Sequence, residues 1–193
     1  MSDVLIPFDD EATTAAVIAS AQRWLELAVI GLNLCPFAKA VYVKQQIRYA
    51  VTAATTAQEL LAELRHELEV LGQANPDEVD STLLIHPRAL TDFFDFRSFL
   101  RQADALVRRL GHEGSLQIAS FHPAYEFADS TPDDVANCTN RSPHPTLHLL
   151  REASIDRAVA AFPDAAAIYE RNVETLRRLG HEGWRRLWTT DSG

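Results

Sequence analysis

Three short apolar runs alternate with long amphipathic segments in this chain, and the alternation constrains the fold more than any other feature. The short runs, at 47–51, 82–86 and 115–121, have the length and composition of strands. The long segments, at 13–32, 55–72 and 92–110, carry apolar residues at spacings of three and four, as helices covering a sheet do. This order predicts an α/β fold with a small three- to four-stranded parallel or mixed sheet, packed by about five helices. An α+β, ferredoxin-like arrangement is the alternative if one strand runs antiparallel.

The remainder of the chain predicts two more helices, at 146–160 and 163–179. Residues 146–188 would then be a C-terminal helical extension, packed on a single α/β domain that spans 1–193. The apolar content of 47% is sufficient for the core of one domain of this size.

Charge and composition limit the classes of partner. The formal charge of −9, with no cluster of basic residues, argues against nucleic acid as a partner. No apolar run reaches about 18 residues and the first ten lack a secretion signal, so we expect a cytoplasmic protein with no membrane partner. Cys35 and Cys138 are then expected as thiols. A homo-oligomer is compatible with these features.

The segment 118–148 concentrates polar chemistry after the third predicted strand. It holds three histidines, a cysteine, an arginine and two asparagines, and four prolines stiffen it. His86 and His122 each follow an apolar run directly, so both are expected at the carboxyl edge of the sheet, where open α/β sheets bind ligands. If the two strands are neighbours, about 4.8 Å apart, both imidazoles can point into one crevice.

Histidine is the side chain best suited to proton transfer near neutral pH. We therefore predict His122 as a catalytic acid/base, assisted by His86, with Glu126 fixing its tautomer. The alternative is that each imidazole simply ends its strand by bonding a loop carbonyl.

A planar guanidinium suits bidentate capture of a carboxylate or phosphate, so Arg141 is the predicted anion clamp. Asn140 and Ser142 would add neutral hydrogen bonds, and Cys35 would line the substrate pocket. Alternatively, Asn140 and Ser142 bond their own backbone in a turn. The leading hypothesis is an enzyme that acts on a small anionic, carboxylate- or phosphate-bearing metabolite, with hydrolysis, lyase chemistry and group transfer all open.

The second hypothesis is a metal-binding or thiol-based redox protein. A divalent transition metal is the one cofactor that the residues suggest, because imidazole and thiolate are its preferred ligands. Two of the candidates are four residues apart, which would align them on a helix. The candidate ligands are His86, His122, His144, His148 and Cys138. A third hypothesis is a non-enzymatic binding module that uses the aromatic-rich segment 91–96.

The stretch Leu34–Lys39 contains a Cys-Pro-Phe-Ala tetrad that resembles the active site of omega-class glutathione transferases and the Cys-Pro-Tyr-Cys of glutaredoxin. The resemblance covers four residues. It implies a reactive Cys35 at the start of a helix, where the helix dipole lowers a thiol pKa. Otherwise Cys35 and Phe37 pack in the core while Pro36 ends a helix.

Four separated motifs, at Leu34–Lys39, Gln117–Pro123, Thr139–Pro143 and Leu147–Glu152, occur in order along the chain. Together they resemble an uncharacterised bacterial domain-of-unknown-function family of about this length. The resemblance covers almost the whole chain and implies a single stand-alone domain. It carries no activity and no catalytic role.

Overall fold

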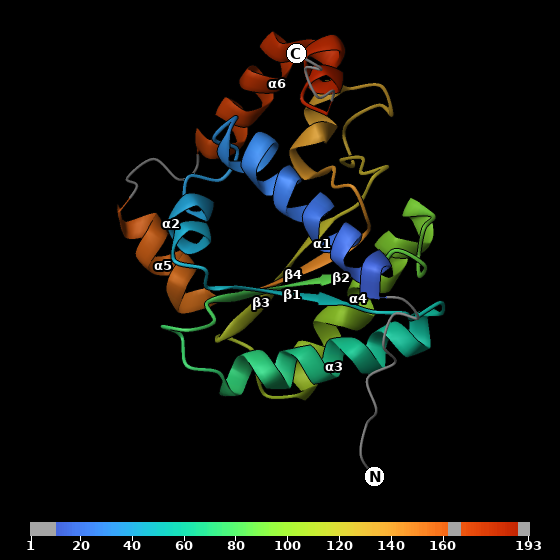
Figure 1. Cartoon of the computed structure of the whole chain (residues 1–193), viewed down its shortest axis with the longest axis vertical. Helices are drawn as coiled ribbons and strands as arrows, with labels where there is room; N and C mark the ends of the chain where they lie inside the picture. Colours follow the sequence, from blue (N-terminus) through green and yellow to red (C-terminus); the bar gives the residue numbers. More distant parts are fainter. Residues whose placement is uncertain (1–10, 162–166, 189–193) are drawn as a thin grey trace.

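The computed structural model describes residues 11–161 and 167–188. Figure 1 shows one sheet with helices on both sides. The sheet has four strands in the order β1-β2-β4-β3. Their bounds are Ile47–Val51 for β1, Ser81–Ile85 for β2, Leu116–Phe121 for β3 and Thr146–Arg151 for β4.

The sheet is mixed. β1 and β2 pair in parallel, and β4 runs antiparallel to both of its neighbours, β2 and β3. The three predicted strands therefore share one direction, as expected, and a fourth strand of opposite direction separates the second from the third. This confirms the α/β prediction with a mixed sheet.

The helix predicted at 146–160 is wrong in its first six residues, which form β4. Leu147 and Leu149 project from one face of this strand and are completely buried. A short apolar run of this kind suits a central strand as well as a buried helix, and pairing on both edges decides the outcome here. The helix α5 begins only at Glu152 and ends at Ala161. Residues 146–188 are thus not a purely helical extension, because their first part completes the sheet.

Two helices cover the first face of the sheet, α3 (Ala57–Gln73) and α4 (Phe93–Arg109), as Figure 1 shows. A capping box begins α3, with Thr56 and Glu59 bonding each other's backbone N–H groups. Asp92 caps α4. The core between these helices and the sheet is built mainly of apolar side chains; its largest members are Leu60, Leu64, Leu68, Leu71, Phe96, Phe99, Leu106, Leu147 and Leu149.

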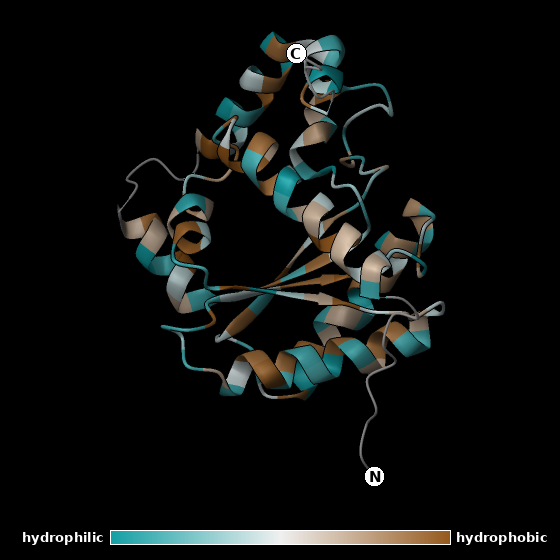
Figure 2. Ribbon diagram, in the orientation of Figure 1, coloured by the Kyte–Doolittle hydropathy of each residue, from teal (hydrophilic) through white to brown (hydrophobic). Residues whose placement is uncertain are grey.

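The second face is covered by α1 (Glu11–Trp24) and by the π-helical turn η1 (Leu25–Ile30) that continues it. Trp24 packs edge-on against Phe121, with ring centroids 5.0 Å apart. A short helix, α2 (Ala38–Val43), follows. In Figure 2 the strands are largely brown, whereas the outer helices carry both brown and teal segments.

The C-terminal helix α6 (Ala167–Arg186) lies away from the sheet and packs on the 3-10 helix η2 (Val135–Asn140). Leu176 of α6 is buried with Leu34, Val135 and Cys138 in a small apolar cluster. α6 bends at Gly180, whose φ of 67° is left-handed and therefore suits glycine. The helix predicted at 163–179 is confirmed from Ala167 onward, and Pro163 lies outside the described residues.

None of the helices in the described ranges is long and apolar enough to cross a membrane.

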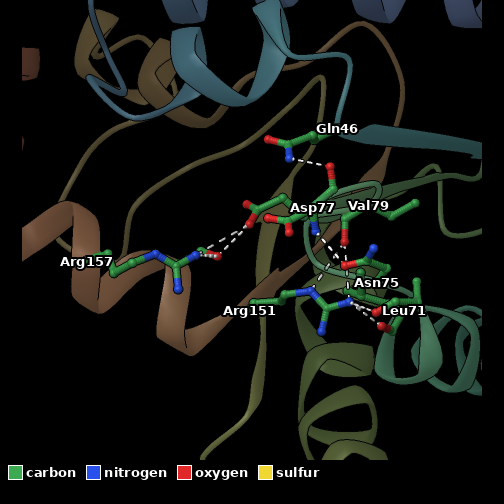
Figure 3. A network of polar contacts seen from close by, with 10 residues as sticks. Gln46, Leu71, Asn75, Asp77, Val79, Arg151 and Arg157 are labelled. Atoms are coloured by element: carbon green, nitrogen blue, oxygen red, sulfur yellow. Dashed lines mark hydrogen bonds and ion pairs between the residues drawn. The ribbon is translucent and has the colours of Figure 1, made fainter.

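Arg151 at the end of β4 ties the sheet to the end of α3. Its Nη2 donates to the carbonyls of Leu71 and Ala74, at 2.6 and 2.8 Å, and its Nε donates to Val79 O at 3.3 Å (Figure 3). The last carbonyls of a helix lack intrahelical partners and carry the negative end of its dipole. The guanidinium therefore satisfies both the hydrogen bonding and the charge of this helix end.

We expect Arg151→Met to lower the free energy of unfolding by about 2–4 kcal/mol, because it leaves three carbonyls without their donor. Arg157→Met is the matched control, since Arg157 is 69% exposed and lies 4.0 Å from Asp80. Its loss should cost less than about 1 kcal/mol. Urea denaturation measures both, and equal effects of the two substitutions would contradict the role given to Arg151.

Candidate functional site

His86 and His122 lie at the carboxyl ends of β2 and β3, as predicted, but these strands are not neighbours. β4 lies between them. The two imidazoles instead come together on the α4 side of the sheet, where both contact the ring of Phe96. The centroid distances are 5.7 Å for His86 and 5.1 Å for His122.

Both imidazoles hold the loop between β2 and α4. Nδ1 of His86 donates to Ala89 O at 2.9 Å, and Nε2 of His122 donates to Leu90 O at 3.2 Å. Nδ1 of His122 accepts from the N–H of Ala124 at 3.1 Å, which fixes the neutral tautomer with the proton on Nε2. Glu126 therefore does not set the tautomer of His122, because both ring nitrogens already have backbone partners.

The same two histidines are almost completely shielded from water, with 0% of His86 and 1% of His122 exposed. Burial lowers the pKa of His86 to about 4 and also lowers the pKa of His122. Both rings are consequently neutral at pH 7. Their geometry matches the structural alternative, in which a histidine ends its strand by bonding a loop carbonyl.

The predicted anion clamp donates to backbone carbonyls of its own loop. Nε of Arg141 donates to Tyr125 O at 3.2 Å, and Nη2 donates to Pro132 O at 2.8 Å. Nδ2 of Asn140 donates to Ser120 O at 3.1 Å, and the hydroxyl of Ser142 donates to His144 O at 2.6 Å. These groups close the loop on itself, so an anion would have to displace bonds that are already made.

Asn137 has the same role at the centre of this loop. It is completely buried, and its Oδ1 accepts from the N–H of Phe127 and the hydroxyl of Ser130. Its Nδ2 donates to Thr131 O at 2.8 Å. The loop between β3 and β4 is thus a packed unit in which most of the buried polar side chains named here bond its backbone, Thr139 Oγ1 being an exception.

The predicted metal ligands are not brought together. Within the described ranges, no group of three or more His, Cys, Asp or Glu side chains could hold a metal ion. His144 lies in the loop before β4 and His148 within the strand, so the helical alignment predicted for the pair does not occur. Cys138 is 1% exposed, and burial raises its thiol pKa.

Cys35 lies in the loop just before α2, which begins at Ala38 with Phe37 as its N-cap, whereas the Cys-Pro-Phe-Ala resemblance implies a cysteine at the start of the helix. Burial raises its pKa, whereas backbone hydrogen bonds from Phe37 and Ala38 lower it. Burial has the larger effect on the pKa of Cys35, so its thiol is protonated at neutral pH. A π-helical turn and a loop precede it here, in place of the strand found in the redox families.

The family resemblance noted in the four motifs can now be set beside this geometry. A family model described as a protein of unknown function, DUF1415, matches residues 16–186. The chain belongs to this family. No curated protein and no solved structure matches the chain. The family description supplies no activity, so functional roles rest on the geometry of the residues.

Among the described histidines, His148 differs from His86 and His122, whose rings bond loop carbonyls. His148 lies on the second face of the sheet, in a row across the strands with Tyr49, Leu83 and Ala119. The residue is half-buried, whereas its Nε2 is shielded from water and has no partner among the described residues. Burial lowers its pKa to about 4, so the ring is neutral at pH 7. The sequence suggested His148 only as a metal ligand, because the segment was expected to be helical.

Tyr49, in the same row, has its pKa raised to about 12, first by burial and then by the charges of Tyr42 and Glu26. The hydroxyl of Tyr42 donates to Oε1 of Glu26 at 2.5 Å. This bond places a carboxylate beside the tyrosines at the η1 end of the second face. Neither Tyr49 nor Glu26 was singled out from the sequence, since no spacing along the chain relates them.

A hollow of about 740 Å³ lies between the loop 127–136 and α6. Its charged lining is mainly acidic and its walls include two aromatic rings. The carboxylates would repel the anionic ligand predicted from the sequence. The lining includes Phe127, Asp129, Asp134, Tyr169, Glu170, Glu174 and Arg177.

The buried neutral state of His86 predicts a dependence of stability on pH. The unfolded chain takes up a proton at this residue near pH 6.5, whereas the folded chain does so only near pH 4, so acid favours unfolding. His86 alone should reduce the free energy of unfolding by about 2 kcal/mol between pH 7 and pH 5.

Denaturation of the wild type and of His86→Gln at both pH values isolates this contribution, because the other histidines are common to both proteins. The variant should lose less stability on acidification than the wild type. Parallel losses in the two proteins would show that His86 is not held neutral.

Proposed function

We propose that the protein is an enzyme that acts on a small anionic metabolite by histidine acid/base catalysis, with His148 as the acid/base in place of His122. The observation that carries the proposal is the ring of His148, which is neutral and has no partner for Nε2. His122 is a poor candidate by comparison, because both of its nitrogens already bond the backbone.

An imidazole nitrogen that is shielded from water and unpartnered costs about 1–3 kcal/mol. A buried polar atom without a partner therefore calls for an explanation. A ligand that donated a hydrogen bond to Nε2 would remove this cost. His86 also has an unpartnered Nε2, but no part of its side chain is exposed. His148 differs because the residue is half-buried, although its Nε2 is shielded, and its neighbour on β3 in the row is the small Ala119.

Tyr49 supplies a candidate proton donor on the same face. Its raised pKa keeps the phenol protonated at neutral pH. Leu83 lies between Tyr49 and His148 in the row, which puts their backbones two strand spacings, or about 10 Å, apart. The phenol and the imidazole thus lie on one face of the sheet as a candidate donor and acceptor, the pair that acid/base catalysis uses.

The anionic character of the substrate follows from the pKa of His148. A base that titrates near pH 4 is weak at neutral pH, but a negative charge beside the ring stabilises its protonated form and raises its pKa. A carboxylate- or phosphate-bearing substrate would thus bring the ring toward the neutral range in which histidine is most effective. Cys35 packs against the same apolar cluster as Leu83 and could contact the substrate.

The test is a comparison of small-molecule pools incubated with wild type or with His148→Asn and followed by mass spectrometry. We expect at least one anionic metabolite to be consumed by the wild type and turned over about a hundred- to ten-thousandfold more slowly by the variant. The variant should keep its circular-dichroism spectrum, because the replaced ring makes no hydrogen bond through Nε2 to a described residue.

His66→Asn on α3 is the control for the loss of an imidazole away from the proposed site. His122→Gln tests the rival assignment, and any loss there should follow its melting temperature. If the wild type consumes no metabolite, or if His148→Asn retains full turnover, the proposal is wrong.

A further inference from the structure

A second and smaller hollow lies between the loop 31–37 and α6, with a volume of about 300 Å³. Its polar lining consists mainly of hydrogen-bond donors, which come from both segments. Volumes of this order suit one small molecule. The polar and charged lining residues are Asn33, Arg171, Asn172, Glu174, Thr175 and Arg178.

Three of these residues form one stripe of α6. Arg171, Thr175 and Arg178 have the spacing i, i+4 and i+7, which puts them on the same side of a helix. The stripe faces the loop, because Nδ2 of Asn172 donates to Leu34 O at 2.8 Å and joins the two segments. Two arginines and a threonine therefore line one hollow, and Nε of Arg171 also donates to Ala167 O at 3.3 Å.

The loop side of the hollow adds a further donor. Asn33 lies there with a left-handed φ of 53°, a conformation that asparagine tolerates better than most residues. Its neighbour Leu34 is buried, which anchors this part of the loop against α6. The position of Asn33 opposite the arginine stripe is thus fixed by packing on both sides.

The charge of this hollow is opposite to that of the whole chain. It has two arginines against one glutamate, in a protein with a net charge of −9. Arg178 makes no ion pair with any residue of the described ranges, whereas Arg177 beside it lies 3.9 Å from Asp134. An arginine without a carboxylate partner keeps its fork of donors for an external anion.

We propose that this hollow is a binding site for a small dianionic group, a phosphate or a pair of carboxylates, held by Arg171 and Arg178 with Thr175 and Asn33. The site is separate from the row that contains His148, and it does not depend on the reaction proposed there. The sequence had assigned anion binding to Arg141, whose donors are instead used within its own loop.

The experiment is isothermal titration of the full-length protein with inorganic phosphate and, separately, with succinate, at a constant ionic strength set with chloride. We expect saturable binding of at least one of the two anions, and the comparison distinguishes phosphate from paired carboxylates. Arg178→Met should weaken that binding about tenfold or more, because a charged, directional donor is lost.

Arg177→Met is the matched control, since it removes the same charge from the next residue of the same helix. It should change the dissociation constant less than about twofold, and Glu174→Gln should strengthen binding because one repelling charge is removed. Absence of binding by both anions would overturn the proposal. Equal weakening by Arg177→Met and Arg178→Met would also overturn it, because the effect would then be one of net charge alone.

Discussion

The insertion of β4 between β2 and β3 is the constraint on which the rest of this structure depends. The strand pairs over its whole length on both edges, so it joins two strands that the chain would otherwise leave apart. Leu147 and Leu149 fill the closed core on one side, and His148 projects to the other. Arg151 at its end then bonds the carbonyls of Leu71 and Ala74 at the end of α3 and that of Val79 in the following loop. One six-residue strand thereby supplies the middle of the sheet, part of the core and the proposed acid/base.

The same insertion explains why the segment 122–145 is so polar. The chain must leave β3 and return in the opposite direction as its immediate neighbour, and it does so through a long loop. A long connection in a compact domain needs its own bonding, because buried backbone groups must be satisfied. Asn137, Asn140 and Arg141 provide that bonding. The concentration of polar residues that suggested an active site is largely the internal framework of this loop.

The sequence was sufficient to predict the elements whose signals lie within a few neighbouring residues. The capping box at Thr56, the cap at Asp92 and the periodicity of α3 and α4 each depend on residues within one or two turns. It was insufficient for β4, because a six-residue apolar run has no periodicity long enough to exclude a helix. The error at β4 then removed His148 from the candidate catalytic residues. Tyr49 and His148 are related only by strand order, which no spacing in the chain encodes.

The buried histidines show why residue type is a weaker guide to function than bonding state. His86 and His122 have the setting expected of catalytic residues, at the carboxyl edge of a sheet and with lowered pKa values. Yet a pKa lowered by burial indicates only that the charged form is disfavoured, and both structural and catalytic histidines meet that condition. The bonding of the ring nitrogens discriminates further when it is considered together with exposure. Both nitrogens of His122 bond the backbone, and the unpartnered Nε2 of His86 belongs to a fully buried residue. The half-buried His148 has an Nε2 that no described residue bonds.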